Sequence, residues 1–234
     1  MISRVVLGLL CLLVACLCEE ENHVVSYYSG VRLQSRRPDL PYFLHSHDVT
    51  YGAPDNRYSV TASEREDDTQ NMWQIFPDPS KSGEKGYTLG DALICGDNVT
   101  LLHSNSARFL TTDPSRVSMV SKSMNKKNAY EIYADGSIKN EPEGALWRVE
   151  CVGGKTEPCS GTHRCSRDGK AVTTGTQVKF VHDASGAALQ CTNHKYGHPL
   201  QGQLEVVSQK SSTSSAADKW KIAAGWFFDQ GMNE

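Results

Sequence analysis

The chain has 234 residues, of which 38% are hydrophobic and 8% aromatic, and its formal net charge is −3 at pH 7. A weakly acidic chain has no overall positive field to hold nucleic acid or an anionic membrane, so we expect no partner of either kind. A chain of this length can form one or two domains, and a single all-β domain of this size is ordinary.

The first segment predicts export from the cytosol. Arg4 supplies a positive charge, residues 5–17 are apolar, and Cys16 and Cys18 place small side chains where a signal peptidase cuts. About 13 helical residues rise only about 20 Å, less than the roughly 30 Å of a bilayer core. We therefore expect residues 1–18 to be a cleaved signal peptide. We expect no membrane insertion, because no later stretch is long and apolar enough to span a bilayer.

Three segments begin with alternating apolar and polar residues after a turn, a pattern typical of strands with one buried face. They start at 30–33, 98–101 and 177–180. Each segment ends with a Trp-polar-aliphatic triplet. The three tryptophans, Trp73, Trp147 and Trp220, lie 74 and 73 residues apart and are expected in the core.

Between these landmarks the pattern also recurs. A second strand is expected at Phe43-Leu44, Phe109-Leu110 and Ala188-Leu189, and a third at 59–61, 119–121 and 205–207. Such a short unit cannot bury its apolar face alone, whereas three units around one axis share a core. The sequence therefore predicts an all-β fold, a β-trefoil with pseudo-threefold symmetry. An open β-sandwich is the alternative, but it does not require three equally spaced Trp triplets. The expected units cover about 23–80, 91–151 and 170–228, followed by a short tail at 229–234.

The residues at 44–49 (Leu-His-Ser-His-Asp-Val), followed by Tyr51 and 59–61, resemble the first MIR motif of the stromal cell-derived factor 2 family. The third unit agrees at 178–182 and 196–206. The middle unit departs from the pattern, because it has Leu-Thr-Thr-Asp-Pro where the family has a second Leu-His-Ser-His.

The resemblance extends over 23–228 and implies a protein of the endoplasmic-reticulum lumen built from three MIR repeats. It implies a non-enzymatic quality-control subunit that joins a J-domain co-chaperone and the heat-shock ATPase BiP. The clients would be misfolded or O-mannosylated chains, and no cofactor is expected. The alternative is a secreted or surface lectin for mannose-type glycans. Secretion stays open, because residues 231–234 (Gly-Met-Asn-Glu) are not a retention signal of the Lys-Asp-Glu-Leu type.

Five cysteines follow the predicted signal peptide. Cys95 and Cys151 stand at the two ends of the second unit, which a trefoil brings together at its base, and the family has cysteines at both places. We expect a disulfide between them. It would close a loop of 56 residues. Cys191, in a predicted strand, is expected to be buried and reduced, with pairing to a partner chain as the alternative.

Cys159 and Cys165 flank a short stretch of a polar, glycine-rich insert at 153–175, and we expect a second, local disulfide there. A zinc site formed by these cysteines and His163 is the alternative. Its spacing matches no standard zinc finger, and an oxidising lumen favours the disulfide, so we expect no metal.

The candidate binding site is His45, Ser46, His47 and Asp48, with Tyr51. The two histidines are two residues apart in a strand, so they point to the same side, where they offer hydrogen bonds to sugar hydroxyls or a peptide backbone. Tyr51 would add an apolar platform beneath a sugar ring. The alternative is that both histidines only pin the following turn.

Two further patterns bear on function. Asn98 begins the sequon Asn-Val-Thr, a possible N-glycosylation site that adjoins a half-buried strand. No Gly-x-Ser-x-Gly, His-Glu-x-x-His or phosphate-loop pattern occurs, so we expect no catalytic residues. The acidic stretch 64–68 is expected to be a solvated loop, with a partner contact as the alternative.

Overall fold

The computed structural model describes residues 22–37, 41–51, 57–81, 87–123, 128–158, 169–210 and 215–228. Within these ranges nearly all regular structure is β, which confirms the predicted all-β class. The strands are β1 (Gly30–Ser35), β2 (Phe43–Thr50), β3 (Tyr58–Ser63), β4 (Met72–Pro77), β5 (Asn98–His103), β6 (Arg108–Val117), β7 (Ala129–Asp135), β8 (Trp147–Pro158), β9 (Lys170–His182), β10 (Ala188–Lys195), β11 (Leu204–Gln209) and β12 (Trp220–Trp226). The helical turns are η1 (Thr69–Asn71), η2 (Pro79–Lys81), α2 (Met119–Ser123) and η3 (Ala216–Asp218).

Six of the strands close into a ring. Antiparallel pairs join β1 to β12, β12 to β9, β9 to β8, β8 to β5, β5 to β4, and β4 back to β1. The alternation predicted from 30–33, 98–101 and 177–180 lies in three of these strands, β1, β5 and β9. Closure leaves these strands no free edge and encloses their inward side chains.

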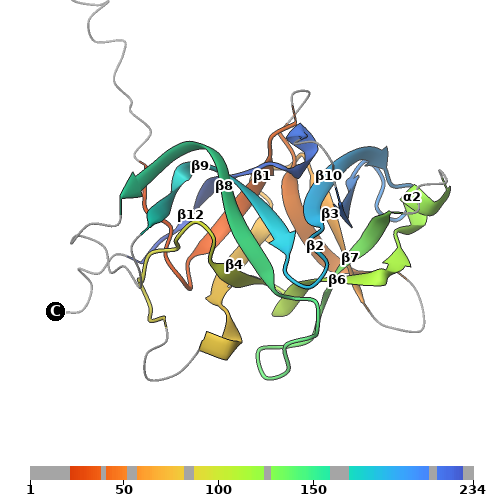
Figure 1. Ribbon diagram of the computed structural model, residues 1–234. Helices are drawn as coiled ribbons and strands as arrows, with labels where there is room; N and C mark the ends of the chain where they lie inside the picture. Colours follow the sequence, from red (N-terminus) through yellow and green to blue (C-terminus); the bar gives the residue numbers. More distant parts are fainter. Residues whose placement is uncertain are drawn as a thin grey trace, which may run out of the picture.

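The other six strands form three hairpins, β2–β3, β6–β7 and β10–β11. The return strands of the hairpins also pair with one another, β3 with β7, β7 with β11 and β11 with β3. In Figure 1 the hairpins lie on the right, and the ring strands β8, β9 and β12 lie to the left of them. The hairpins therefore come together on one side of the ring.

The three tryptophans occupy matching environments. Each is the first or second residue of its strand, has no exposed surface, and donates its indole N–H to the backbone carbonyl of a buried leucine at 3.0 Å. The pairs are Trp73–Leu44, Trp147–Leu110 and Trp220–Leu189. We call residues corresponding when they stand at the same number of positions from these leucines or tryptophans.

The main hydrophobic core contains all three tryptophans and leucines, together with Tyr27 and Phe180, and two smaller clusters are separate from it. The predicted disulfide Cys95–Cys151 is confirmed and packs against this core, with its Cα atoms 5.5 Å apart. Cys191 is buried and makes no disulfide. Cys159, Cys165 and His163 lie outside the described residues, as do the predicted signal peptide and tail.

One predicted strand is wrong. Residues 119–121 fall in the short helix α2, and the third strand of that unit is β7, which begins at Ala129. The helix is anchored by the buried carboxylate of Glu205, which accepts hydrogen bonds from the hydroxyl of Ser118 and from both the amide (2.9 Å) and hydroxyl (2.9 Å) of Ser121. A contact with a residue so distant in sequence overrides the local pattern.

The flanks of the polar insert 153–175 continue strands β8 and β9, which pair as far as Pro158 and Lys170. They form an extended arm beyond the ring. Among the residues that the structure describes, no helix has the length and apolar character needed to cross a membrane.

Candidate functional site

The predicted site residues lie on β2, in the first hairpin, and the structure buries two of them. His45 is only 3% exposed, and its Nδ1 atom is 3.0 Å from Oδ1 of Asn71 in η1. Asn71 in turn donates to the backbone carbonyl of Arg65 at 2.6 Å. Ser46 is buried and donates to the carbonyl of Ser59 at 3.0 Å. His45 therefore fixes the acidic loop between β3 and β4.

The remaining predicted residues lie nearer the surface. His47 is half-buried, with its ring 5.1 Å from that of His45, and Asp48 is exposed. The Nε2 atom of His47 is buried and has no hydrogen-bond partner in the described part of the chain. The Tyr51 hydroxyl donates to the Val60 carbonyl at 2.9 Å and accepts from the Val60 amide at 3.2 Å. Tyr51 thus closes the hairpin.

Two further histidines pack against the buried tryptophans. The rings of His103 and Trp73 are 5.0 Å apart, and those of His182 and Trp147 are 5.4 Å apart. Burial lowers the pKa of His103 to about 4 and also lowers the pKa values of His45 and His182. These imidazoles are therefore neutral at pH 7 and act as buried hydrogen-bonding groups.

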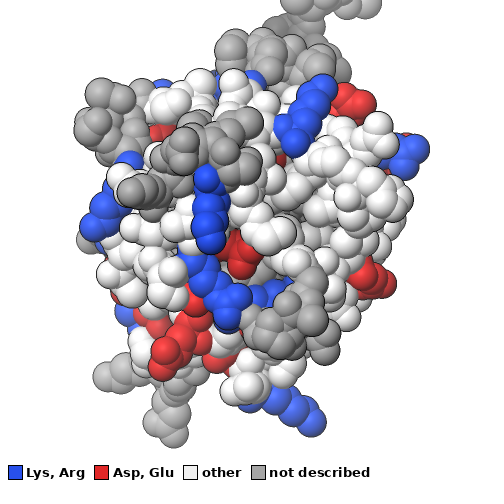
Figure 2. All heavy atoms as spheres, turned by 90° about the vertical axis from the view of Figure 1, so that its right-hand side faces the viewer, with Lys and Arg blue, Asp and Glu red and all other residues white. Residues whose placement is uncertain are grey.

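A cavity of about 680 Å³ lies beside the second hairpin, and we call it the hairpin cleft. Its lining residues come from β6, β7, the segment before β8, the end of β9 with the turn after it, the segment that leads into β3, and the residue after β11. They are Arg57, Thr112, Asp113, Pro114, Tyr130, Tyr133, Glu143, Gly144, His182, Ala184, Ser185 and Lys210. Figure 2, which faces the hairpin side of the molecule, shows basic and acidic side chains together around a hollow near the middle of that face.

Arg57, which stacks on Tyr133, and the carboxylate of Asp113 lie together in the lining of the hairpin cleft. The guanidinium carbon of Arg57 lies 4.1 Å from the centroid of the Tyr133 ring, and an Arg57 nitrogen lies 4.0 Å from an oxygen of Asp113. Burial raises the pKa of Tyr133 to about 12, so its hydroxyl stays protonated. Hydrogen bonds from Ser115, together with Arg57 and Arg116, lower the pKa of Asp113 and keep it charged. The cleft therefore offers donors and acceptors within one space, and the partly exposed ring of Tyr130 adds aromatic surface.

Small residues leave this space open at the second hairpin. Thr111 corresponds to His45, and Gly144 corresponds to Gln70, so both positions carry smaller side chains than in the first unit. Gly144 cannot be replaced without strain, because its φ is +85° and an added Cβ would lie 2.3 Å from the Thr112 carbonyl oxygen. Of these two residues, Gly144 lines the cleft.

The comparisons with known proteins identify the family. No family model matches the chain. The mouse protein named stromal cell-derived factor 2-like protein 1 is 31% identical over 192 residues, which are 81% of this chain and 73% of the mouse protein. The chain belongs to the stromal cell-derived factor 2 family. Human stromal cell-derived factor 2 is 28% identical over 204 residues, which are 87% of this chain and 82% of the human protein.

Solved structures share the fold of this family member. The crystal structure of the SDF2-like protein from Arabidopsis thaliana has a TM-score of 0.72 at 24% identity and covers 91% of this chain and 100% of its own. The S. cerevisiae protein O-mannosyltransferase Pmt1-Pmt2 complex, bound to its sugar donor, has a TM-score of 0.68 at 18% identity. That match covers 89% of this chain and 27% of the yeast chain.

In this member of the stromal cell-derived factor 2 family, the predicted binding residues and the hairpin cleft lie at different places. The sequence pattern that carries the resemblance marks His45 and His47, whereas the cleft lies where that pattern is lost. Tyr130 and Tyr133, in β7, and Thr112 and Asp113, in β6, were not predicted as site residues. The loss of the Leu-His-Ser-His pattern in the second unit was the one signal that could have indicated them.

The structure also bears on the sequon and on metal binding. Asn98 begins β5, is half-buried, and its amide lies 3.4 Å from Asp183, while Thr100 of the sequon is fully buried. Within the described ranges no cluster of histidine, cysteine, aspartate or glutamate side chains has the arrangement of a metal site.

Proposed function

We propose that this protein is a β-trefoil of three MIR repeats. Three features support the proposal: the ring of six strands, the three mutually paired hairpins, and the three matching Trp–Leu hydrogen bonds. Each predicted unit contributes two ring strands, one hairpin and one Trp–Leu hydrogen bond. Diverged copies of one unit differ locally, and here histidines fill a site in the first unit, whereas a cleft lies beside the hairpin of the second.

In this proposal the protein is a non-enzymatic quality-control subunit of the endoplasmic-reticulum lumen. It binds unfolded or O-mannosylated client chains and works with a J-domain co-chaperone and BiP. Membership of the stromal cell-derived factor 2 family is the observation that carries the proposal. The predicted signal peptide at 1–18 agrees with entry into this compartment, and the disulfide Cys95–Cys151 agrees with an oxidising one.

The hairpin cleft is the proposed client site. A cavity of about 680 Å³ lies within the usual size range of ligand sites, roughly 300–1,000 Å³. Arg57 and Asp113 offer charged hydrogen bonds to peptide groups, and the partly exposed Tyr130 offers aromatic surface to a sugar or an apolar side chain. His45 is a positioning residue for the loop at 64–68 and does not contact the client.

The experiment is an affinity purification from native cell lysate with the tagged protein as bait. We expect BiP and a J-domain protein to co-purify, and we expect the purified protein to suppress aggregation of a denatured client. A bait with Arg57→Ala and Lys210→Ala should lose clients, whereas the matched bait with Arg108→Ala should keep them. Recovery of neither chaperone would contradict the proposed complex.

The second candidate is a lectin for mannose-type glycans. The mixed lining of the cleft favours it, because tyrosines beside carboxylates are well suited to sugar rings and hydroxyls. A glycan array distinguishes the two functions. Saturable mannose binding without chaperone recovery supports the lectin, and chaperone recovery without a glycan signal supports the quality-control subunit.

A further inference from the structure

A second cavity lies on the ring strands, away from the hairpins. Its volume is about 460 Å³. Lys155 on β8, Lys221 on β12 and Arg36, one residue beyond the end of β1, contribute the cationic side chains. Asn22, Gln177 and two glycines complete the lining that the structure describes, and none of these seven residues is acidic. We call this cavity the cationic pocket.

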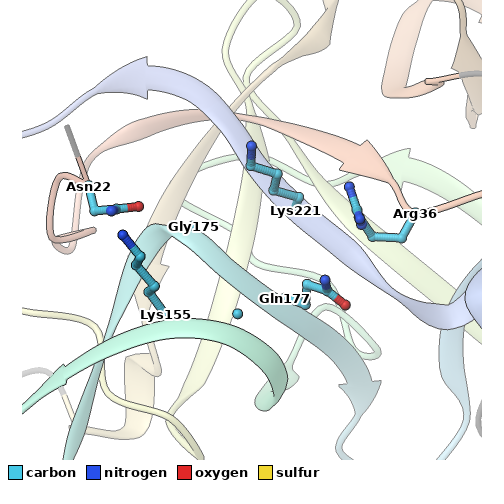
Figure 3. Close-up of a pocket in the computed structure, with 7 residues that line it drawn as sticks. Asn22, Arg36, Lys155, Gly175, Gln177 and Lys221 are labelled. Carbon is cyan, nitrogen blue, oxygen red and sulfur yellow. The ribbon is translucent and has the colours of Figure 1, made fainter. Parts of the chain in front are cut away.

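The backbone fixes the positions of these side chains. Lys221 pairs with Gln177 across β12 and β9, and Gln177 pairs with Gly153 across β9 and β8. The amide of Arg36 donates to the carbonyl of Lys219 at 2.9 Å, which ties the end of β1 to β12. Figure 3 shows the Lys155 side chain reaching toward Asn22, with Arg36 and Gln177 on the other side of the pocket. The cationic groups are therefore held on one continuous sheet.

Close backbone approach shapes one wall of the pocket. Gly154 has a φ of +78°, and a Cβ added there would lie 2.1 Å from the carbonyl oxygen of Gly175. A Cβ at Gly175 would lie 2.5 Å from Oδ1 of Asn22. Glycine at both positions lets the extended arm of β8 and β9 fold close to Asn22. The pocket depends on this approach.

The positive charge of the pocket is local and does not follow from the net charge of the chain. The whole chain carries a formal charge of −3, yet three cationic side chains share this cavity. A group of cations in one cavity attracts an anion.

We propose that the cationic pocket binds a phosphate monoester of monosaccharide size. Arg36 presents a planar pair of donors that matches phosphate oxygens, and the two lysines add point charges. The amides of Asn22 and Gln177 both donate and accept, as the hydroxyls of an attached sugar require. The volume lies within the range of small-ligand sites and exceeds what a phosphate group alone fills.

Isothermal titration calorimetry of the purified protein with mannose 6-phosphate tests this proposal. Mannose and inorganic phosphate are the comparison ligands. We expect saturable binding of mannose 6-phosphate that weakens as salt is added, weaker binding of phosphate, and no binding of mannose at this pocket. Lys155→Gln with Lys221→Gln should weaken binding at least about tenfold, because each lost charge-assisted hydrogen bond is worth roughly one decade of affinity.

The matched control is Lys170→Gln with Lys195→Gln. It makes the same change of charge at two exposed lysines outside the pocket, so we expect less than about a twofold effect on affinity. Melting curves check that both variants are folded. Equal affinities of the pocket variant and the control, or no saturable binding by the unmodified protein, would overturn the proposal.

An array of phosphorylated and unphosphorylated glycans then identifies the source of the ligand. Retention of phosphorylated glycans indicates a sugar phosphate carried on a glycoprotein, and binding of the free ligand alone indicates a soluble sugar phosphate. Both results support the pocket. The residues of the hairpin cleft are separate from those of the cationic pocket, so failure here leaves the proposed client site untouched.

Discussion

Arg57, beside the first hairpin, stacks on Tyr133 of the second hairpin, and Arg108 of the second hairpin stacks on Tyr58 of the first. The Arg57 guanidinium carbon lies 4.1 Å from the centroid of the Tyr133 ring, and that of Arg108 lies 4.3 Å from the centroid of Tyr58. The backbone supports both contacts, because Tyr58 pairs with Ala134 across β3 and β7. The first and second hairpins are therefore clamped by two reciprocal cation–aromatic contacts.

The clamp predicts similar stability losses for the two arginines. Each contact is worth about 0.5–2 kcal/mol of unfolding free energy, so Arg57→Ala and Arg108→Ala should each lower it by an amount in this range. Urea denaturation of the two variants provides the measurement. A loss well above 2 kcal/mol for either variant would mean that the arginine supports the core in some further way.

The matching tryptophans predict a matching series of mutants. Replacing Trp73, Trp147 or Trp220 with Phe leaves a buried leucine carbonyl without its donor and removes buried volume. We expect each change to cost roughly 2–4 kcal/mol of unfolding free energy. Trp226, which is 43% exposed, is the control, and its replacement by Phe should cost less than about 1 kcal/mol. One core tryptophan that behaves like Trp226 would break the equivalence of the three units.

The lowered pKa of His103 predicts loss of stability in mild acid. The unfolded imidazole takes up a proton near its ordinary pKa of 6.5, whereas the folded one does so only near a pKa of about 4. Between these values the unfolded chain binds the extra proton, so the free energy of unfolding falls as the pH falls through this window. The full contribution is on the order of 3 kcal/mol.

The variant His103→Gln checks this prediction. It removes the titrating group, while His45 and His182 contribute equally to both proteins. Urea denaturation from pH 7 to pH 4 should therefore show a shallower decline for the variant than for the unmodified protein. Parallel declines would show that His103 does not carry this pH dependence.

The disulfide predicts a large cost of removal. The bond between Cys95 and Cys151 closes a loop of 56 residues, for which the loss of unfolded-state entropy is worth about 4 kcal/mol. The double variant Cys95→Ala with Cys151→Ala should lose about this much, as measured by guanidinium denaturation under oxidising conditions. A loss below about 1 kcal/mol would show that the constraint matters little in the unfolded state.

Much of the fold could be predicted from the sequence because its signals are local and repeated. The spacing of Trp73, Trp147 and Trp220 and the short apolar alternations indicated the units. The lining of the cleft could not be predicted residue by residue, because it brings together Arg57 and Tyr133, which no local pattern connects. The burial of His45 also escaped prediction, since it depends on Asn71 from a later loop.

The central claim is that the hairpin cleft holds client chains, and fluorescence anisotropy with a permanently unfolded client tests it most directly. Carboxymethylated lactalbumin, with and without O-mannose, is a suitable probe. We predict that Arg57→Ala raises the dissociation constant at least about tenfold, as expected for the loss of a charge-assisted contact. Arg108→Ala, which breaks the reciprocal contact outside the cleft, should change it less than about twofold. Equal effects of the two variants on client binding would contradict the account.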